Sequence, residues 1–112
     1  MRLHGWLALL GLGLISACQT PPGVAQAQWT EHERHLIRMV RQDCGSCHGM
    51  RLTGGLGPPL TPEALRHLPM DSLVATIYEG RAGTPMPGWK TMISAADARW
   101  IAEHLQQGFP QE

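Results

Sequence analysis

The chain of 112 residues is poor in aromatic side chains and carries no excess of charge of either sign. It has one Phe, one Tyr and four Trp, and nine basic residues balance nine acidic ones. Nucleic-acid-binding proteins show clustered Lys and Arg, so this balance argues against a nucleic-acid partner. The glycines at positions 54, 55 and 57 are not followed by Gly-Lys-Ser/Thr, which argues against a phosphate-binding loop. No internal repeat is present, and the length predicts one small domain with a modest core.

A long apolar segment is also missing. The apolar run from Trp6 to Ile15 has ten residues, which is too short to span a bilayer. Because Arg2 precedes this run, the N-terminus is typical of an export signal.

Cysteine is scarce, with three residues, and two of them fall in the stretch Cys44-Gly45-Ser46-Cys47-His48. Cys-x-x-Cys followed at once by His is the spacing at which a haem is attached covalently. Each thiol would add to one vinyl group, and His48 would become the proximal ligand of the iron. A thioredoxin-like redox pair and part of a zinc site are the alternatives. Zinc needs about four ligands, and beyond this stretch only Cys18 and scattered histidines remain.

Met86 is the candidate for the distal ligand of the iron. A thioether is a soft donor that favours ferrous iron, so His/Met ligation raises the reduction potential and suits electron transfer. Pro85 and Pro87 flank it and restrict the backbone, which would hold the sulfur in place in both redox states. Most methionines fill gaps in cores, and we expect that role for Met39, Met70 and Met92. Met50 follows His48 too closely to reach the opposite face of the ring.

The chain from about Trp29 to Gln107 resembles the class I c-type cytochromes. The attachment box at residues 44–48 matches that family, Gly57-Pro58-Pro59-Leu60 resembles its Gly-Pro-x-Leu loop, and Met86-Pro87 resembles its distal Met-Pro. The resemblance implies an all-α fold of about four helices around one covalent haem c. It also implies that the carbonyl of Pro58 accepts a hydrogen bond from His48, which tunes the iron ligand.

The runs at residues 55–63 and 80–87 are similar to a narrower group, the small cytochromes c55X or NirC encoded beside cytochrome cd1 nitrite reductase in denitrifying bacteria. This resemblance implies a monomeric electron carrier, not an enzyme, that passes single electrons to cytochrome cd1 nitrite reductase or a related periplasmic protein. Service to haem d1 maturation is an alternative role. A haem-based ligand sensor or peroxidase, with a displaceable Met86, is an alternative of another class.

The family pattern is not matched everywhere. A small residue and an aromatic residue often precede the first attachment cysteine by eight and four positions, but Leu36 and Val40 stand there. The aromatic residue expected late in the last helix falls at His104. We expect Trp100, one turn earlier, to take over that packing.

Two processing patterns compete at the N-terminus. The residues before Cys18 resemble a lipobox, which would make residues 1–17 a leader, lipidate Cys18 and leave residues 18–28 as a linker. Ala25-Gln26-Ala27 resembles an ordinary cleavage site before Gln28. The lipobox is favoured because it directly follows the apolar run and explains the third cysteine. Either pattern predicts a periplasmic domain of residues 29–112, with a tether to the membrane in the first case.

Four helical segments are expected in this domain. Thr30 and Glu33 form a capping box before a helix that carries Leu36, Val40, Cys44 and Cys47 on one apolar face. A short helix begins at Pro62, another begins at Pro69 or Asp71 and ends at Gly80, and the last runs from Ser94 to Gly108 and packs on the first.

Several polar residues near these motifs are candidates to bind the haem propionates, because half-buried carboxylates need charged or N–H partners. They are Arg51, Arg81, Trp89 and Lys90. His32, His35 and His67 are expected to be exposed helix residues.

Overall fold

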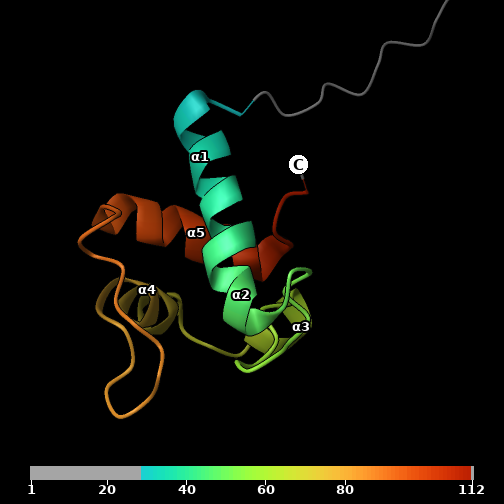
Figure 1. Ribbon diagram of the computed structural model, residues 1–112, viewed down its shortest axis with the longest axis vertical. Helices are drawn as coiled ribbons and strands as arrows, with labels where there is room; N and C mark the ends of the chain where they lie inside the picture. Colours follow the sequence, from blue (N-terminus) through green and yellow to red (C-terminus); the bar gives the residue numbers. More distant parts are fainter. Residues whose placement is uncertain (1–28, 112) are drawn as a thin grey trace, which may run out of the picture.

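The computed structural model describes residues 29–111, and these contain six helical segments and no strand (Figure 1). The all-α fold expected from the sequence is therefore confirmed. None of the helices in this part of the chain is long and apolar enough to cross a membrane. The expected leader, the lipidation of Cys18 and both cleavage sites lie outside the described residues.

The first three segments form one continuous helical rod (Figure 1). It consists of α1 (Glu31–Met39), the π-helical turn η1 (Val40–Cys44) and α2 (Gly45–His48). The rod begins with the expected capping box, in which Thr30 accepts from the Glu33 amide and the Glu33 carboxylate accepts from the Thr30 amide. The rod thus leads from the cap directly into the Cys-x-x-Cys-His stretch.

The π-helical turn corrects the expectation of a single apolar face. Leu36 and Val40 are buried, but Cys44 is half-buried and Cys47 is exposed. A π turn bonds residue i to i+5 and places more residues in each turn than an α-helix. The side chains after Val40 are therefore rotated relative to the α-helical spacing from which their common face was predicted.

The remaining helices are α3 (Pro62–Leu65), α4 (Met70–Glu79) and α5 (Ala95–Gln107). Their bounds confirm the start and stop signals read from the sequence. Thr61 caps α3 through the Ala64 amide, and Pro69 precedes α4. The Thr61 side chain thus gives a first-turn amide of α3 a hydrogen-bond partner, which stabilises the start of this helix.

A glycine ends each of the two longer helices, α4 and α5. Gly80 has φ +80° after α4, and Gly108 has φ +107° after α5. Residues with a Cβ rarely adopt such angles, so glycine allows the chain to leave the helix without strain.

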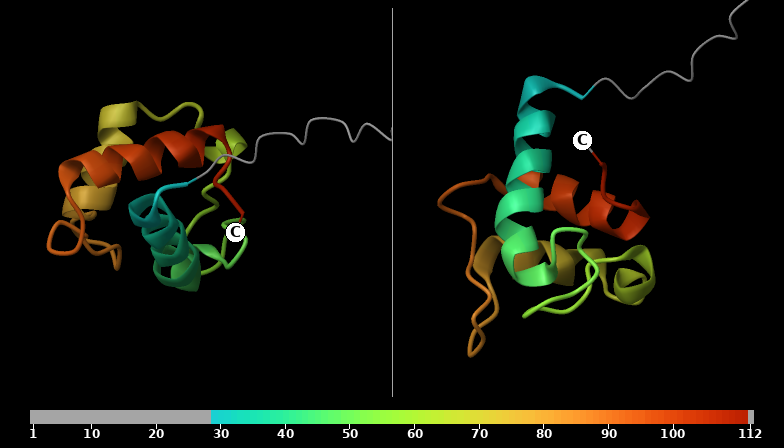
Figure 2. Two further views of the ribbon diagram at one scale, coloured as in Figure 1. Left: turned by 90° about the horizontal axis from the view of Figure 1, so that it is seen from above. Right: turned by 45° about the vertical axis from the view of Figure 1, so that its right-hand side comes forward.

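The last helix packs on the first, as expected, and also along α4. Figures 1 and 2 show α1 and α5 crossing, with α4 beside α5. His32 of α1 lies 2.7 Å from Asp97 of α5, joining Nε2 to Oδ1. This contact joins the first turn of α1 to the first turn of α5.

Aromatic side chains fill the crossing of α1 and α5. Trp100 stacks on His104 with ring centroids 3.8 Å apart, and Trp29 meets Trp100 edge-on at 5.9 Å. Trp100 therefore packs at this crossing, as expected. Such pairs add about 0.5–1.5 kcal/mol to the effect of burial alone.

Fourteen apolar side chains form the core. They are Leu36, Ile37, Met39, Val40, Leu52, Leu65, Leu73, Ile77, Ile93, Ala98, Ile101, Ala102, Leu105 and Phe109. Met70 packs half-buried against this cluster. Met92 is 65% exposed, so the prediction that it fills the core was wrong. It lies in the turn that follows Trp89, where its amide donates to the Trp89 carbonyl at 2.8 Å.

Asp97 gives the fold a dependence on pH. Burial raises the pKa of Asp97, but hydrogen bonds from His32 and Ser94 outweigh it, so this pKa lies below its ordinary value of 3.8. A lowered pKa stabilises the fold above pH 3.8, and this contribution is lost as the pH falls further. We expect Asp97→Asn to lower the free energy of unfolding by about 1 kcal/mol at pH 6, with a smaller difference below pH 3.

Urea unfolding at pH 2–7 measures this effect. Asp71→Asn is the matched control, because Asp71 is 89% exposed in its pair with Arg99, and such surface pairs contribute little. A difference between wild type and Asp97→Asn that stays constant across this pH range would contradict the expectation.

Candidate functional site

His48 ends the helical rod with one ring nitrogen fixed and the other free. Its side chain is 8% exposed, and Nδ1 lies 2.7 Å from the carbonyl oxygen of Pro58. A carbonyl accepts only, so Nδ1 carries the proton and Nε2 keeps its lone pair. The structure therefore contains the contact that the resemblance implied, and it leaves Nε2 as the metal-binding nitrogen.

The loop from residue 49 to residue 60 is folded tightly against the end of α2. The Gly54 amide donates to the His48 carbonyl at 2.8 Å, and the Gly57 amide donates to the Cys47 carbonyl at 2.8 Å. These bonds use carbonyls that the end of a helix otherwise leaves without a partner. They also bring the Gly57 backbone against the imidazole ring.

Gly57 is needed because no side chain fits there. A Cβ at this position would lie 2.7 Å from Cε1 and 2.8 Å from Nδ1 of His48. We expect Gly57→Ala to displace the ring or the loop and to lower the free energy of unfolding of the haem-loaded protein by about 2 kcal/mol, as overpacking does. Urea unfolding and the yield of haem-loaded protein measure this.

A control for this variant is Gly83→Ala, because a Cβ at Gly83 would meet nothing within 4 Å. Gly83 has φ +77°, so its variant reports only backbone strain, whereas the Gly57 variant reports steric contact with the ring. Haem loading and stability equal to wild type in Gly57→Ala would contradict the close approach.

The two thiols before His48 form no disulfide with each other, and they differ in environment. Cys44 is half-buried, and burial, followed by the charge of Asp43, raises the pKa of its thiol to about 11. A dithiol redox motif instead lowers the pKa of its attacking cysteine. The environment of Cys44 thus argues against the thioredoxin-like alternative.

The arrangement also argues against zinc. No three side chains among His, Cys, Asp and Glu converge on a metal site in residues 29–111. Structural zinc takes four such ligands. Two thiols on adjacent helical turns and an imidazole with a free Nε2 instead fit a haem attached through both sulfurs, with this nitrogen as its iron ligand.

Met86 lies in a loop whose two ends are joined at α4. The Trp89 and Lys90 amides donate to the carbonyls of Ile77 and Tyr78, each at 3.1 Å. Within the loop, the Met86 carbonyl accepts from the Arg81 amide at 3.2 Å. The backbone around Met86 is thereby held in shape by bonds that do not depend on its side chain.

The Met86 loop and the His48 segment lie at the same end of the molecule (Figures 1 and 2). Gly80 and Gly88 bring the two ends of the loop together, because a Cβ at Gly80 would lie 2.6 Å from the Gly88 nitrogen. Met86 itself is half-buried. This placement suits a second axial ligand whose position is fixed before and after a change of redox state.

The predicted propionate partners differ in their present contacts. Arg51 and Arg81 are exposed and make no ion pair with another described residue. Lys90 binds Glu79 at 2.7 Å, which raises the pKa of the lysine, and Trp89 is half-buried against the core. The two arginines are therefore the better candidates to bind propionates.

The three histidines that were expected to be exposed are exposed. His32, His35 and His67 all lie on the surface, and only His32 among them has a hydrogen-bond partner in the described part of the chain. His32 and His35 lie on α1, as expected, but His67 lies in the turn between α3 and α4, so the prediction of a helical position was wrong for this residue.

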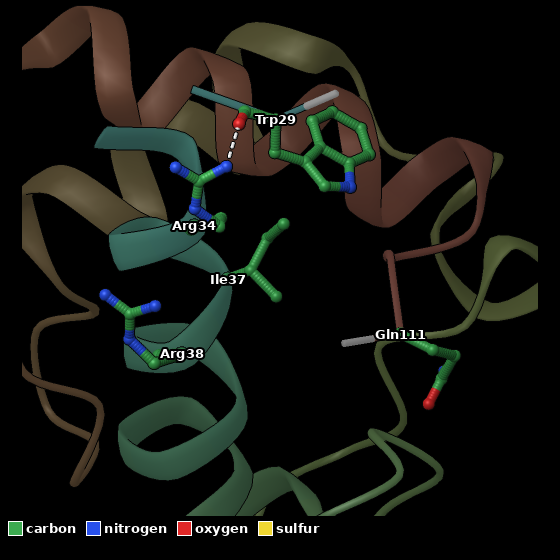
Figure 3. A pocket seen from close by; sticks show the side chains of 5 residues that line it. All are labelled: Trp29, Arg34, Ile37, Arg38 and Gln111. Carbon is green, nitrogen blue, oxygen red and sulfur yellow. Dashed lines mark hydrogen bonds between the residues drawn. The ribbon is translucent and has the colours of Figure 1, made fainter. Parts of the chain in front are cut away.

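A separate hollow of about 300 Å³ lies between the start of α1 and the C-terminal tail (Figure 3). It is lined by Trp29, Ile37, the side chains of Arg34 and Arg38, and Gln111. Since α1 begins there and the Cys-x-x-Cys-His stretch ends the same rod, this hollow is not the haem site.

One residue near the site was missed by the sequence analysis. Arg41, in η1, is half-buried and binds carbonyls of the tail after α5. Nothing in the local pattern distinguishes it from the exposed arginines, because its partners are backbone atoms 68 and 69 residues away.

Known proteins that are similar to this chain include c-type cytochromes. Residues 21–105 match the family model described as cytochrome c oxidase, cbb3-type, subunit III. The chain is 50% identical over 103 residues to cytochrome c55X of Pseudomonas aeruginosa, covering 92% of this chain and 84% of that one. A solved structure of c-type cytochrome NirC superposes with a TM-score of 0.70 at 55% identity, covering 71% of this chain and 94% of that one.

A longer relative has a different name. The chain is 33% identical over 112 residues to dihydro-heme d1 dehydrogenase of Pseudomonas aeruginosa, which covers all of this chain and 20% of that protein. The likeness is thus to one section of the dehydrogenase.

Proposed function

Because the chain belongs to the cytochrome c55X group of c-type cytochromes, we propose that it carries single electrons in the periplasm to cytochrome cd1 nitrite reductase. It also belongs to the family described by the matching model, and its cofactor is haem c. The expected resemblance and the expected cofactor are confirmed by the comparisons. The partner and the compartment are proposals. So are the roles of individual residues.

Four side chains would hold the haem. Cys44 and Cys47 would bind it through thioether bonds, Nε2 of His48 would bind the iron, and Met86 would bind from the opposite side. The haem supplies a reversible one-electron change between ferric and ferrous iron. The carbonyl of Pro58 keeps the proton on Nδ1 and fixes the ring plane, so His48 needs no proton transfer when the iron changes charge.

The observation that best supports this role is that backbone bonds fix both candidate ligands: the Pro58 carbonyl holds the His48 ring, and bonds to α4 hold the loop that carries Met86. Electron transfer is fast when little has to rearrange between the two redox states. A neutral imidazole and a neutral thioether, each positioned by the backbone, meet that condition. Two filled axial positions also leave no place for a substrate at the iron, which favours a carrier over an enzyme.

Stopped-flow mixing of reduced protein with oxidised cytochrome cd1 nitrite reductase tests the proposed partner. We expect the haem band of this protein to shift to its oxidised position within the turnover time of the reductase, with one electron lost per molecule. The charge of the chain is near balance, so the rate should depend weakly on salt. Absence of oxidation over many turnover times would reject this partner.

The likeness to dihydro-heme d1 dehydrogenase favours haem d1 maturation as a second candidate role. Dehydrogenation of a dihydro-haem removes two electrons and two protons. Two oxidised molecules of this protein would each take one electron, and the protons would go to water.

Mixing such a dehydrogenase, its dihydro-haem and the oxidised protein tests this role. Two molecules of reduced cytochrome should appear for each haem d1 formed. Formation of haem d1 without reduction of the cytochrome would reject the second role and leave the first untouched.

The lipid tether is a further proposal, because Cys18 lies outside the described residues. Mass spectrometry of protein isolated from bacterial membranes would show a diacylglyceryl group on Cys18. A mature chain that starts at Gln28 would instead establish the ordinary cleavage site.

A further inference from the structure

Arg41 joins the turn before the attachment cysteines to the C-terminal tail. Its Nη2 donates to the carbonyl oxygens of Phe109 at 3.0 Å and Pro110 at 2.6 Å, and its Nε donates to Pro110 at 3.2 Å. The guanidinium carbon lies 5.4 Å from the Phe109 ring centroid. Bonds from a charged, planar donor to several acceptors are stronger and more directional than neutral ones.

The tail that supplies these carbonyls is itself anchored. Phe109 is 8% exposed, and its ring meets Trp100 edge-on at 6.3 Å. Gly108, with its positive φ, turns the chain back from the end of α5 toward α1 (Figure 1). The tail is therefore a fixed support to which Arg41 is bound.

The segment that Arg41 fastens is a π-helical turn. Such turns are rare within α-helices and occur often at functional sites. This one runs from Val40 to Cys44, so its shape decides in which direction Cys44, and the following α2 turn with His48, are oriented. Arg38, one turn earlier, differs from Arg41: it is exposed, and its one ion pair within residues 29–111 is with Glu31 of the same helix, at 3.6 Å.

We propose that Arg41 is a positioning residue, which fastens the π-helical turn to the C-terminal tail and so holds the attachment segment and His48 in the orientation that the redox centre requires. The His48 part of this inference rests on the proposed function. The fastening of η1 to the tail does not, because its contacts are present in the chain itself.

Hydrogen exchange of the haem-loaded protein tests the fastening. In Arg41→Gln, the amides of residues 44–48 should exchange about tenfold faster than in wild type, while those of α4 keep their wild-type rates. Arg41→Lys keeps the charge but loses the three-bond fork, so it should show a smaller increase in the same amides. Arg38→Gln, the matched control, should exchange like wild type.

Binding of imidazole to the oxidised protein tests the consequence for the redox centre. An attachment segment that is less fixed lets the iron move away from Met86, so imidazole should displace the thioether at a concentration about tenfold lower in Arg41→Gln. A residue that merely adds stability would not change this affinity while the protein is folded. Arg38→Gln should again match wild type.

The outcomes separate the two claims. Exchange that accelerates equally in all helices, or not at all, would overturn the positioning role of Arg41. Equal imidazole affinity in wild type and Met86→Ala would show that Met86 is not the ligand and would reject that part of the proposed function, but the exchange result would still test the fastening.

Discussion

Replacing Cys44 and Cys47 together with serine is expected to leave the chain without covalent haem and without a stable fold. The buried apolar side chains of the domain are few, and several of them are alanines or lie in single helical turns. Domains of this size often need a cofactor, metal or disulfide in addition to their core. Net stabilities of small domains are about 5–15 kcal/mol, so the loss of the largest apolar group in the core can exceed the whole margin.

Haem staining of denaturing gels and far-ultraviolet circular dichroism measure this result. Ser46→Ala is the matched control, because Ser46 lies between the two cysteines and its hydroxyl donates to the Asp43 carbonyl at 2.7 Å and makes only a long contact, at 3.9 Å, with the Cys47 sulfur. This control should retain haem and helix content. A doubly substituted chain that keeps its helix content and unfolds cooperatively without haem would contradict the view that the haem is part of the core.

Replacing Met86 with alanine is expected to open the sixth position of the iron while leaving the haem attached. The bonds that hold the loop to α4 come from backbone atoms, so the loop should keep its shape. Loss of the thioether removes the donor that favours ferrous iron. The reduction potential should therefore fall by on the order of 0.1–0.3 V, within the range of about 0.8 V that axial ligands span.

Spectroelectrochemistry gives the potential, and addition of carbon monoxide to the reduced protein shows whether the site is open. Met92→Ala is the control. Met92 also follows α4 in the sequence, but it is 65% exposed and has no proposed role. Its potential and its response to carbon monoxide should equal those of wild type. A wild-type potential in Met86→Ala would exclude Met86 as a ligand.

Much of the fold could be predicted from sequence because its signals are local. The capping boxes at Thr30 and Ser94 and the glycines at 80 and 108 specify where helices begin and end, and the structure places the ends there. The Cys-x-x-Cys-His box is equally local, since one turn of chain carries both thiols and the imidazole. Such short-range patterns need no knowledge of distant contacts.

Sequence reasoning missed features that regular helical spacing does not describe. The π-helical turn changes the side-chain spacing after Val40, and its Arg41 binds carbonyls of the tail. Met92 matched the composition of a core residue, but the turn in which it lies exposes it. A helical periodicity reports neither case, because Arg41 binds residues far away in the sequence and Met92 lies in a turn outside the helices.

The spectrum of the reduced wild-type protein with and without carbon monoxide at neutral pH tests the central claim most directly. An electron carrier with His48 and Met86 on the iron has no open position, so we expect the haem bands to stay unchanged when the gas is added. A ready shift of these bands would show a displaceable sixth ligand. That result would contradict the carrier role and establish a ligand sensor or peroxidase in its place.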